Sequence, residues 1–339
     1  MKTFSKLSVL GVLLILVGGA CEKNLHNDYF SDSANPLSKY ITSVDGILKF
    51  QNMTSFKTTL ESLKSKKNFE EFENSYSLQN FVSMRERFSA LNDFEKVEIS
   101  QGITSKYEDF LTVITLGEER EVVRNVGSDA LATLLNKEGK VIIGGELHKF
   151  LYDKMFIVKD YENSKSLRLD RSTQANREIE ICQVKRGSLL HHQNNNAKIN
   201  GNTRYMEEYW SDGRKCRLAG SIDYENWTRD SDPYLVNVYC YTKHQTRSLW
   251  SIWWTTSINT IRLRVEFDGY NLNGFQGHYG PFNIISQNDG WVQFDMPSAC
   301  VNTPNDGYVC SAFYRNVSTQ HSGICWDGQD KLISLFVSQ

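Results

Sequence analysis

Apolar side chains recur at helical spacing through the first part of the chain. Phe56, Leu60 and Leu63 follow one another at intervals of three or four residues, which is the period of an amphipathic helix. The expected helices span about residues 54–63, 68–76, 78–91, 106–114 and 128–135. Apolar runs on either side of Gly144-Gly145 then predict a β-hairpin, because this dipeptide is typical of hairpin turns.

Short strand-like runs replace the helical pattern after residue 177. They span about residues 178–184, 215–222, 234–241, 258–267, 282–285, 291–296 and 308–314. Val236, Val238 and Cys240 alternate with Asn237 and Tyr239, which is the period of a half-buried strand. Turn-forming triplets such as Asn288-Asp289-Gly290 separate several of these runs. Seven or more short strands separated in this way predict a β-sandwich or a related all-β domain.

The change of pattern predicts an α+β fold with two domains. We expect a helix-rich domain with a terminal β-hairpin at residues 41–160 and a disulfide-containing, β-sandwich-like domain at residues 178–339. Residues 161–177 between them are polar and have the composition of a linker. All seven Trp lie in the second of these domains. We therefore expect the β domain to carry the binding chemistry.

The first 20 residues have the three-part pattern of a secretory signal peptide. Lys2 and Lys6 precede an almost wholly apolar run from Leu7 to Val17, which is too short to span a membrane. Small residues then lead into Cys21, in an arrangement that resembles the lipobox of bacterial lipoproteins. Gly18 stands where the lipobox usually has Leu, so ordinary signal cleavage stays open. We expect Cys21 to be lipidated and the polar residues 21–40 to form a tether.

The cysteines support both the lipid and a disulfide framework. If Cys21 carries lipid, an even number of cysteines remains in an exported protein, where disulfides form. The disulfide candidates are Cys182, Cys216, Cys240, Cys300, Cys310 and Cys325. Cys300 and Cys310 are symmetric about a predicted turn, so they could face each other across two strands. Pairings of Cys325 with either of them stay open, because spacing does not decide among fifteen connectivities of six cysteines.

Charge and motifs exclude several classes of function. The net charge of −2 and the lack of a Lys/Arg cluster give no indication of a nucleic-acid partner. His191-His192 lies in a polar loop, and no Cys-x-x-Cys or phosphate-binding Gly-rich loop occurs, so we expect neither a metal nor a cofactor. No Gly-x-Ser-x-Gly elbow is present, and we name no catalytic residue.

Two segments resemble uncharacterised lipoproteins of Bacteroides-type bacteria. Leu131–Gly144 has the pattern of a helix, then Asn-x-x-Gly, then an apolar strand that ends in Gly. Tyr241–Arg247 is a basic, polar stretch followed by Trp250 and Trp253. The resemblance is one of architecture. It implies a lipoprotein associated with the outer membrane, on its periplasmic or cell-surface face, and it implies no assigned activity.

Aromatic side chains are the most suggestive functional feature of the β domain. Exposed Trp and Tyr rings stack on sugars or anchor protein partners, although most Trp residues are buried in cores. The ligand-binding candidates are Trp250, Trp254, Trp210 and Tyr279. On one strand, Trp250 and Trp254 would share a face. The leading hypothesis is therefore a non-catalytic envelope lipoprotein that binds a glycan or a protein partner.

Two alternatives remain beside this hypothesis. A secreted hydrolase acting on glycans would use Glu207 or Glu208 with a second carboxylate, because glycoside hydrolysis needs two such groups. A structural component of the envelope would instead bind another membrane protein. A deep cleft with two separated carboxylates would favour the enzyme, and a broad apolar patch would favour assembly.

Overall fold

The computed structural model describes most of the chain after residue 40. The described residues are 41–77, 79–116, 118–165, 167, 169–189, 206–210, 216–230, 232–270, 276–297, 299–303, 307–311, 314–325 and 328–338. Tyr40–Gln339 forms one compact unit. The predicted signal peptide, Cys21 and the predicted tether lie outside the described residues. Among the described residues, no helix is long and apolar enough to cross a membrane.

Helices gather in the first part of the chain, and the α+β class is confirmed. They are α1 Met53–Lys66, α2 Phe69–Ser77, α3 Met84–Ser89, α4 Asp93–Ser100, α5 Asp129–Leu134 and α6 Tyr161–Ser164. Asn52 caps α1, where its side chain accepts from the Ser55 N–H and the Ser55 hydroxyl accepts from the Asn52 N–H. Ser128 caps α5 in the same position.

One predicted helix is wrong. Residues 106–114 form turns followed by the strand β3 (Leu111–Leu116), which pairs with β4 (Glu119–Arg124). β3 contains four β-branched residues in six positions, and such residues favour strands. The helical spacing of a few apolar residues was outweighed by this pairing. Helix α4, which precedes β3, was not expected from the sequence.

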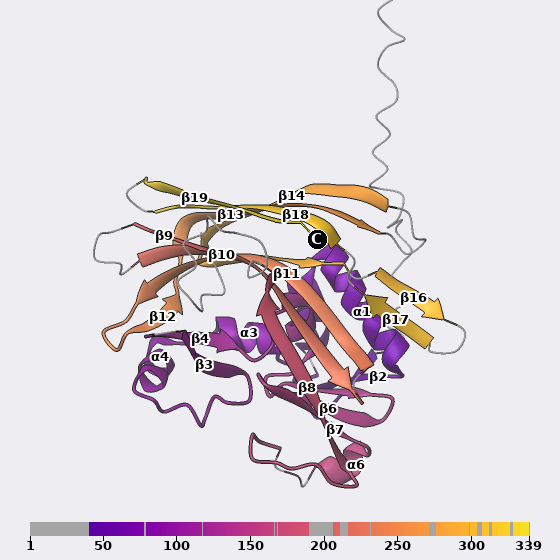
Figure 1. Cartoon of the computed structure of the whole chain (residues 1–339). Coiled ribbons are helices and arrows are strands. Elements are labelled where there is room, and N and C mark those ends of the chain that lie inside the picture. Colours follow the sequence, from indigo (N-terminus) through magenta and orange to yellow (C-terminus); the bar gives the residue numbers. More distant parts are fainter. Residues whose placement is uncertain are drawn as a thin grey trace, which may run out of the picture. The chain divides into compact units, whose positions relative to one another are not determined.

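A 13-stranded sheet is built from both halves of the chain. Its strands are β1 Ile41–Val44, β2 Ile47–Phe50, β3, β4, β5 Lys140–Ile143, β6 Glu146–Phe150, β7 Lys154–Val158, β8 Ile179–Ser188, β9 Met206–Tyr209, β10 Cys216–Arg229, β11 Asp232–Arg247, β12 Ile252–Thr255 and β15 Trp291–Met296. The main path runs β1-β2-β5-β6-β7-β8-β10-β11-β12-β4-β3, with β9 beside β10 and β15 beside β11. Figure 1 shows β8 beside β7, although β8 belongs to the second half of the chain.

The two predicted domains share this sheet. β7 pairs with β8 over five positions, and β12 pairs in parallel with β4. The predicted linker, 161–177, therefore connects two adjacent strands. Its Tyr161 and Leu169 are buried in a small core on the outer face of β5, β6 and β7. A boundary read from polar composition thus falls inside one compact unit.

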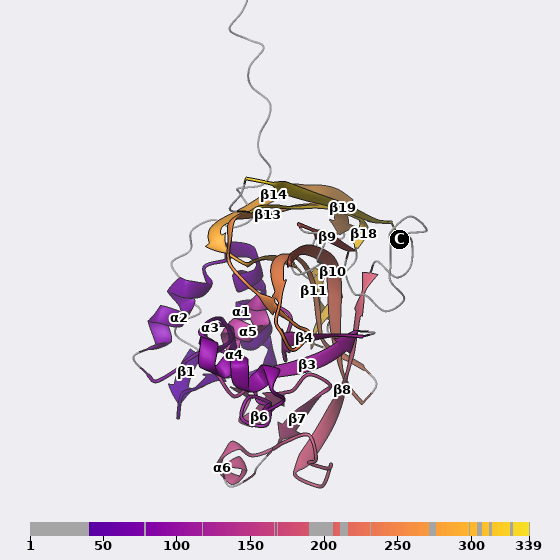
Figure 2. The ribbon, with the colours of Figure 1, turned by 90° about the vertical axis from the view of Figure 1, so that its left-hand side faces the viewer.

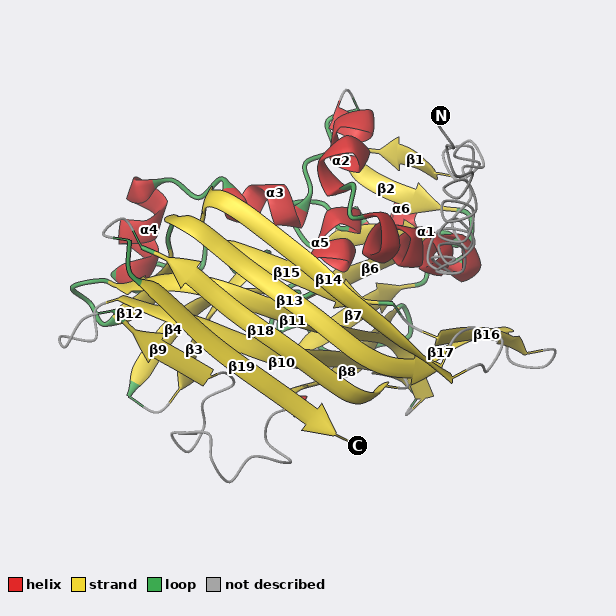
Figure 3. Ribbon diagram, turned by 90° about the horizontal axis from the view of Figure 1, so that it is seen from above, coloured by secondary structure: helices red, strands yellow, loops and turns green. Residues whose placement is uncertain are grey.

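Two further sheets complete the second half. A four-stranded sheet has the order β14 (Gln276–Asp289), β13 (Ile258–Tyr270), β18 (Tyr314–Ile324) and β19 (Asp330–Ser338), and β16 (Ala299–Thr303) pairs with β17 (Gly307–Ser311). Figure 3 shows the four-stranded sheet lying across β10, β11 and β15. An apolar core that includes Ile222, Val238, Leu263 and Phe294 fills the space between these layers.

The opposite face of the large sheet is covered by α1 to α5, which Figure 2 shows grouped on one side. Phe56 and Leu60 of α1 and Leu131 of α5 pack there with Phe150 of β6 and Trp227 of β10. The rings of Phe150 and Trp227 meet edge to face at 5.0 Å between centroids. Burial on this face joins the first and second halves of the chain as firmly as the strand pairing does.

The triplet Asn288-Asp289-Gly290 carries the chain from one sheet to the other. β14 before it pairs with β13, whereas β15 after it pairs with β11. Asn288 has a φ of 56°, in the left-handed region that Asn tolerates. A Cβ at Gly290 would lie 2.3 Å from the carbonyl oxygen of Thr256, so only glycine fits. The turn was predicted from sequence, but its role as a crossover was not.

The disulfide framework is wrong for four of its six candidates. Cys182, Cys216, Cys240 and Cys325 are thiols in this structure and form no disulfide with one another. Sheet geometry gives the reason for two of them. Cys182 lies in the core beneath the helices, whereas Cys240 lies in the core between the sheets. Side chains on opposite faces of one sheet cannot meet.

The remaining candidates, Cys300 and Cys310, oppose each other in the register of the β16–β17 hairpin. The prediction that two strands bring these positions together is confirmed at the level of the backbone. Their side chains lie outside the described residues, so a bond between them stays a prediction.

Candidate functional site: a polar, aromatic cleft

One face of β11 and β15 carries charged and aromatic side chains that are largely covered. Tyr239, Tyr241 and Lys243 alternate along β11, and the Cα register sets Lys243 opposite Trp291 and Tyr241 opposite Gln293. Tyr239, Tyr241 and Lys243 are all buried. Because successive residues of a strand point to opposite faces, these five side chains share the face that looks toward the helices.

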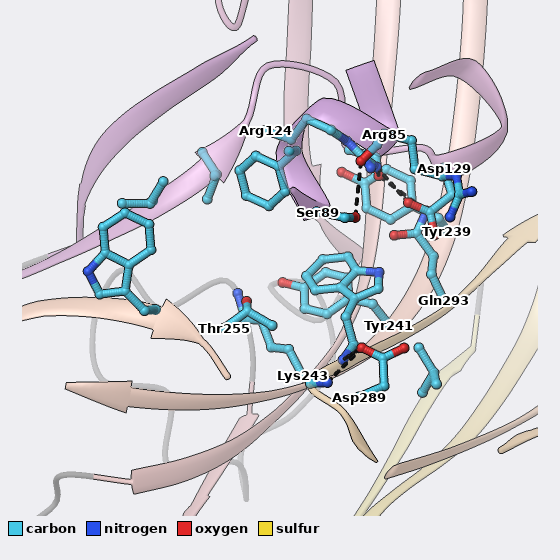
Figure 4. A pocket seen from close by; sticks show the side chains of 18 of the residues that line it. Arg85, Ser89, Arg124, Asp129, Tyr239, Tyr241, Lys243, Thr255, Asp289 and Gln293 are labelled. Carbon is cyan, nitrogen blue, oxygen red and sulfur yellow. Dashed lines mark hydrogen bonds and ion pairs between the residues drawn. The ribbon is translucent and has the colours of Figure 1, made fainter. Parts of the chain in front are cut away.

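A cavity of about 950 Å³ lies against this face. Its other walls come from the first half of the chain. They are formed by Lys67 after α1, Arg85 and Ser89 of α3, Arg124 at the end of β4 and Asp129 at the start of α5. Figure 4 shows Arg85, Arg124 and Ser89 on one side and Lys243, Thr255 and Asp289 on the other, with Tyr241 between them. This volume lies in the range of small-molecule sites.

The aromatic rings form a continuous row. The Tyr241 and Trp291 rings stack with centroids 4.9 Å apart and planes 12° apart. Tyr239 continues the row at 6.3 Å from Tyr241. Glycine at position 127 leaves room for the Tyr239 ring, because a Cβ at that position would lie 1.9 Å from the Tyr239 hydroxyl. Such a row presents flat apolar surface inside a polar cleft.

Ion pairs neutralise most of the cations around the cleft. Lys243 is paired with Glu121 of β4 in a buried contact, and Arg124 donates to Asp129 at 2.7 Å. Burial alone would raise the pKa of Glu121, but Lys243 and Arg217 outweigh it and hold this pKa below its ordinary value. The carboxylate of Glu121 is therefore ionised and fixed.

Two lining residues each leave a buried acceptor oxygen without a hydrogen-bond partner among the described residues. They are Glu121, through Oε2, and Gln293, through Oε1. The Arg217 guanidinium lies 3.9 Å from Glu121 Oε2. Buried acceptors are normally satisfied, and leaving one unsatisfied costs about 1–3 kcal/mol.

Lys67 is a further cation of the cleft that lies over aromatic rings. Its Nζ is 4.0 Å from the centroid of Phe294, a cation–π contact. Burial lowers the pKa of Lys67 to about 8, against the attraction of Asp295.

Asp295 lies on the same face, one step beyond Gln293. It accepts from the Ala130 N–H at 2.8 Å and from Gln293 Nε2 at 3.0 Å. Burial, with repulsion from Asp129, raises the pKa of Asp295 to about 6. Asp295 is 3% exposed and does not line the cavity, so it supports the cleft from beneath.

The structure places the four ligand-binding candidates at separate positions. Trp254 lines the cleft but is 9% exposed, and its Nε1 donates to Ser100 Oγ at 3.1 Å. Trp250 lies in the turn before β12, where it is 42% exposed, so strand alternation does not relate it to Trp254. Trp210 packs edge-on against His244, and Tyr279 stacks on Phe267 at 5.3 Å. Their roles in binding stay predictions.

Sequence reasoning missed Tyr239, Tyr241 and Trp291 as cleft residues. The alternation along β11 was visible, but the residues between its apolar positions were expected to face solvent. The signal that could have found them is the row Tyr-x-Tyr-x-Lys in that phase, since two rings and a long cation seldom lie together on an open strand.

The carboxylates of the hydrolase alternative are not poised across a cleft. Glu207 accepts from Arg217 at 2.8 Å and from the Tyr209 hydroxyl at 2.6 Å, while Glu208 is exposed. His191-His192 lies outside the described residues. Among the described residues, no group of three or more His, Cys, Asp or Glu side chains could hold a metal ion.

Comparisons with known proteins give one structural similarity. No family model matches the sequence, and no curated protein matches it. The chain is similar to the crystal structure of a DUF4848 family protein from Bacteroides thetaiotaomicron VPI-5482, with 14% sequence identity, 87% of this chain and 99% of that chain covered, and a TM-score of 0.26. That protein comes from the bacterial group that the sequence resemblance indicates. At this identity and TM-score, the similarity carries no information about activity or ligand.

Proposed function

We propose that this protein binds a glycan, without cleaving it, in the cleft beneath α3 and α5. The observation that carries the proposal is the row of Tyr239, Tyr241 and Trp291 inside a cavity of about 950 Å³. Aromatic faces stack on the C–H surfaces of sugar rings, and polar side chains at the rim bind their hydroxyl groups. The cleft supplies both kinds of group.

The ion pairs of the cleft favour a neutral, polyhydroxylated ligand. Arg124 and Lys243 already pair with carboxylates, so an anionic ligand would have to compete with Asp129 and Glu121. A neutral oligosaccharide would leave these ion pairs intact.

The test is a glycan-array screen of the purified protein, followed by calorimetry with any glycan that binds. We expect Trp291→Ala to weaken binding about tenfold or more, because it removes a central ring from the row. Trp291→Phe should keep part of the affinity. Trp250→Ala is the matched control, because Trp250 lies outside the cleft. Equal binding by Trp291→Ala and the unchanged protein, or no binding to any glycan, would contradict the proposal.

We also propose that the chain is exported and anchored in the outer membrane through a lipid at Cys21, with residues 178–339 as a sandwich-like layer. The leader pattern and the small residues before Cys21 support the anchor. Metabolic labelling with an alkyne fatty acid in a Gram-negative host should mark the protein but not its Cys21→Ser variant. Labelling of both would overturn the anchor, whereas the glycan-binding proposal would be unaffected.

A further inference from the structure

Cys216 and His244 meet at one end of the β10–β11 pair. The register sets Cys216 opposite Thr246, and Leu218 opposite His244. The two side chains are therefore diagonal neighbours on one face of the pair, which is the face away from the cleft. The Cys216 Sγ lies 2.8 Å from His244 Nε2.

The other imidazole nitrogen fixes the direction of this hydrogen bond. His244 Nδ1 lies 2.7 Å from the carbonyl oxygen of Thr256, and a carbonyl can only accept. Nδ1 therefore carries the hydrogen, which leaves Nε2 of the neutral ring as an acceptor for the thiol proton. Burial lowers the pKa of His244, which keeps the ring neutral near pH 7. A thiol, an adjacent base and a group that orients the base are the parts of an activated nucleophile.

Exposure separates Cys216 from two other thiols of the chain. Cys182 and Cys240 are buried, and burial raises the pKa of each, to about 12 for Cys182. Cys216 and Cys325 are both partly exposed. Among the described residues, an imidazole contacts the Cys216 thiol and none contacts that of Cys325. Cys325 is thus a matched reference within the same molecule.

We propose that Cys216 and His244 form a reactive thiol–imidazole pair that exchanges with low-molecular-weight disulfides. His244 Nε2 takes the proton of the Cys216 thiol, and the thiolate attacks one sulfur of the disulfide. The disulfide bond breaks as the new S–S bond to Cys216 forms. The departing thiolate takes the proton back from His244, so the products are a mixed disulfide on Cys216 and one free thiol. This site is independent of the cleft and of the glycan proposal.

The experiment treats the full chain with limiting 4,4′-dithiodipyridine, quenches with acid and maps the modified peptides by mass spectrometry. Cys216 should be modified about tenfold faster than Cys325, or more, because among the described residues an imidazole contacts Cys216 and none contacts Cys325. Equal rates at the two cysteines in the unchanged protein would overturn the proposal.

The His244→Gln variant tests the role of the base. The rate at Cys216 should fall to about that of Cys325, while the rate at Cys325 stays the same. Cys182 and Cys240 report on folding, because they remain unmodified only while both cores are intact. A rate at Cys216 that stays high in a folded variant would show that the imidazole is not the base. If the variant exposes the buried thiols, the modification rates of Cys216 and Cys325 in the unchanged protein still test the proposal.

Discussion

The two faces of β11 are both buried, yet they differ in almost every chemical respect. Val238 and Cys240 on one face belong to an apolar core between two sheets, whereas Tyr239, Tyr241 and Lys243 on the other face line a cleft. The polar face is covered by the first half of the chain, through α3, β4 and the start of α5. The charges and acceptors of a buried polar face need fixed partners from the protein or from a ligand, whereas water satisfies those of an open polar face.

The comparison also separates two ways of stabilising the same strand. The apolar face contributes through close packing, which tolerates no cavity but needs no specific partner. The cleft face contributes through pairs such as Glu121 with Lys243, which are costly to break and weakly stabilising when intact. Variants on the two faces should therefore differ in their effects on the free energy of unfolding and on ligand affinity.

The largest effect is expected for Glu121→Ala on the cleft face. It would leave Lys243 and Arg217 buried without this carboxylate, and the free energy of unfolding should fall by about 3–5 kcal/mol in urea titrations. Glu119→Ala is the control, since Glu119 also pairs with Arg217 but its side chain is 28% exposed. Glu119→Ala should cost about 1 kcal/mol or less. Similar small losses in both variants would show that the cleft face is not effectively buried.

On the apolar face, Leu263→Ala should lower the free energy of unfolding by about 3 kcal/mol through the cavity that it leaves. Leu263 is 1% exposed and lies in the core between the sheets, away from the cleft. Glycan affinity should therefore stay unchanged in the folded variant. A loss of affinity measured by calorimetry at a temperature where the variant is folded would mean that the two faces are coupled.

A pH-dependent effect is expected for Asp295, beneath the cleft. Burial and Asp129 raise its folded-state pKa to about 6, so the folded state binds this proton more tightly than the unfolded state does. Stability is therefore lost as pH rises from about 4 to 6, on the order of 2 kcal/mol. Asp295→Asn is the control, because its side chain can still accept from the Ala130 N–H but does not titrate. Between about pH 4 and 6, the free energy of unfolding of the unchanged protein should fall relative to that of this variant. A pH-independent difference between the two urea titration series would contradict the raised pKa.

The smallest effect is expected outside both faces. Asn52→Ala removes the cap of α1 and should cost about 1 kcal/mol, with glycan affinity unchanged. Asn52→Gly should cost only a few tenths of a kcal/mol, because glycine also suits this position. A larger loss on thermal unfolding, or weakened binding, would mean that α1 positions the cleft wall at Lys67.

Local sequence determined the elements of this protein wherever the signal was short-range. Ser128 caps α5 at the start of the helix expected at residues 128–135, and Gly144-Gly145 joins β5 to β6. The alternation of Val238 and Cys240 with Tyr239 gave the correct strand and the correct two faces. These features depend on contacts within a few residues, which a single sequence records directly.

Tertiary structure alone decided what covers each face and which strands are neighbours. Period-two alternation shows that a strand has two different faces, but a polar phase fits both solvent and a lined cleft. The pairing of β12 with β4 and the Ala130 N–H bond to Asp295 join residues more than a hundred positions apart. Such contacts depend on the free energy of the whole packed unit, so no local pattern specifies them. The sequence therefore determined the strands and their two phases, and only the packed structure turned one of those phases into a candidate binding site.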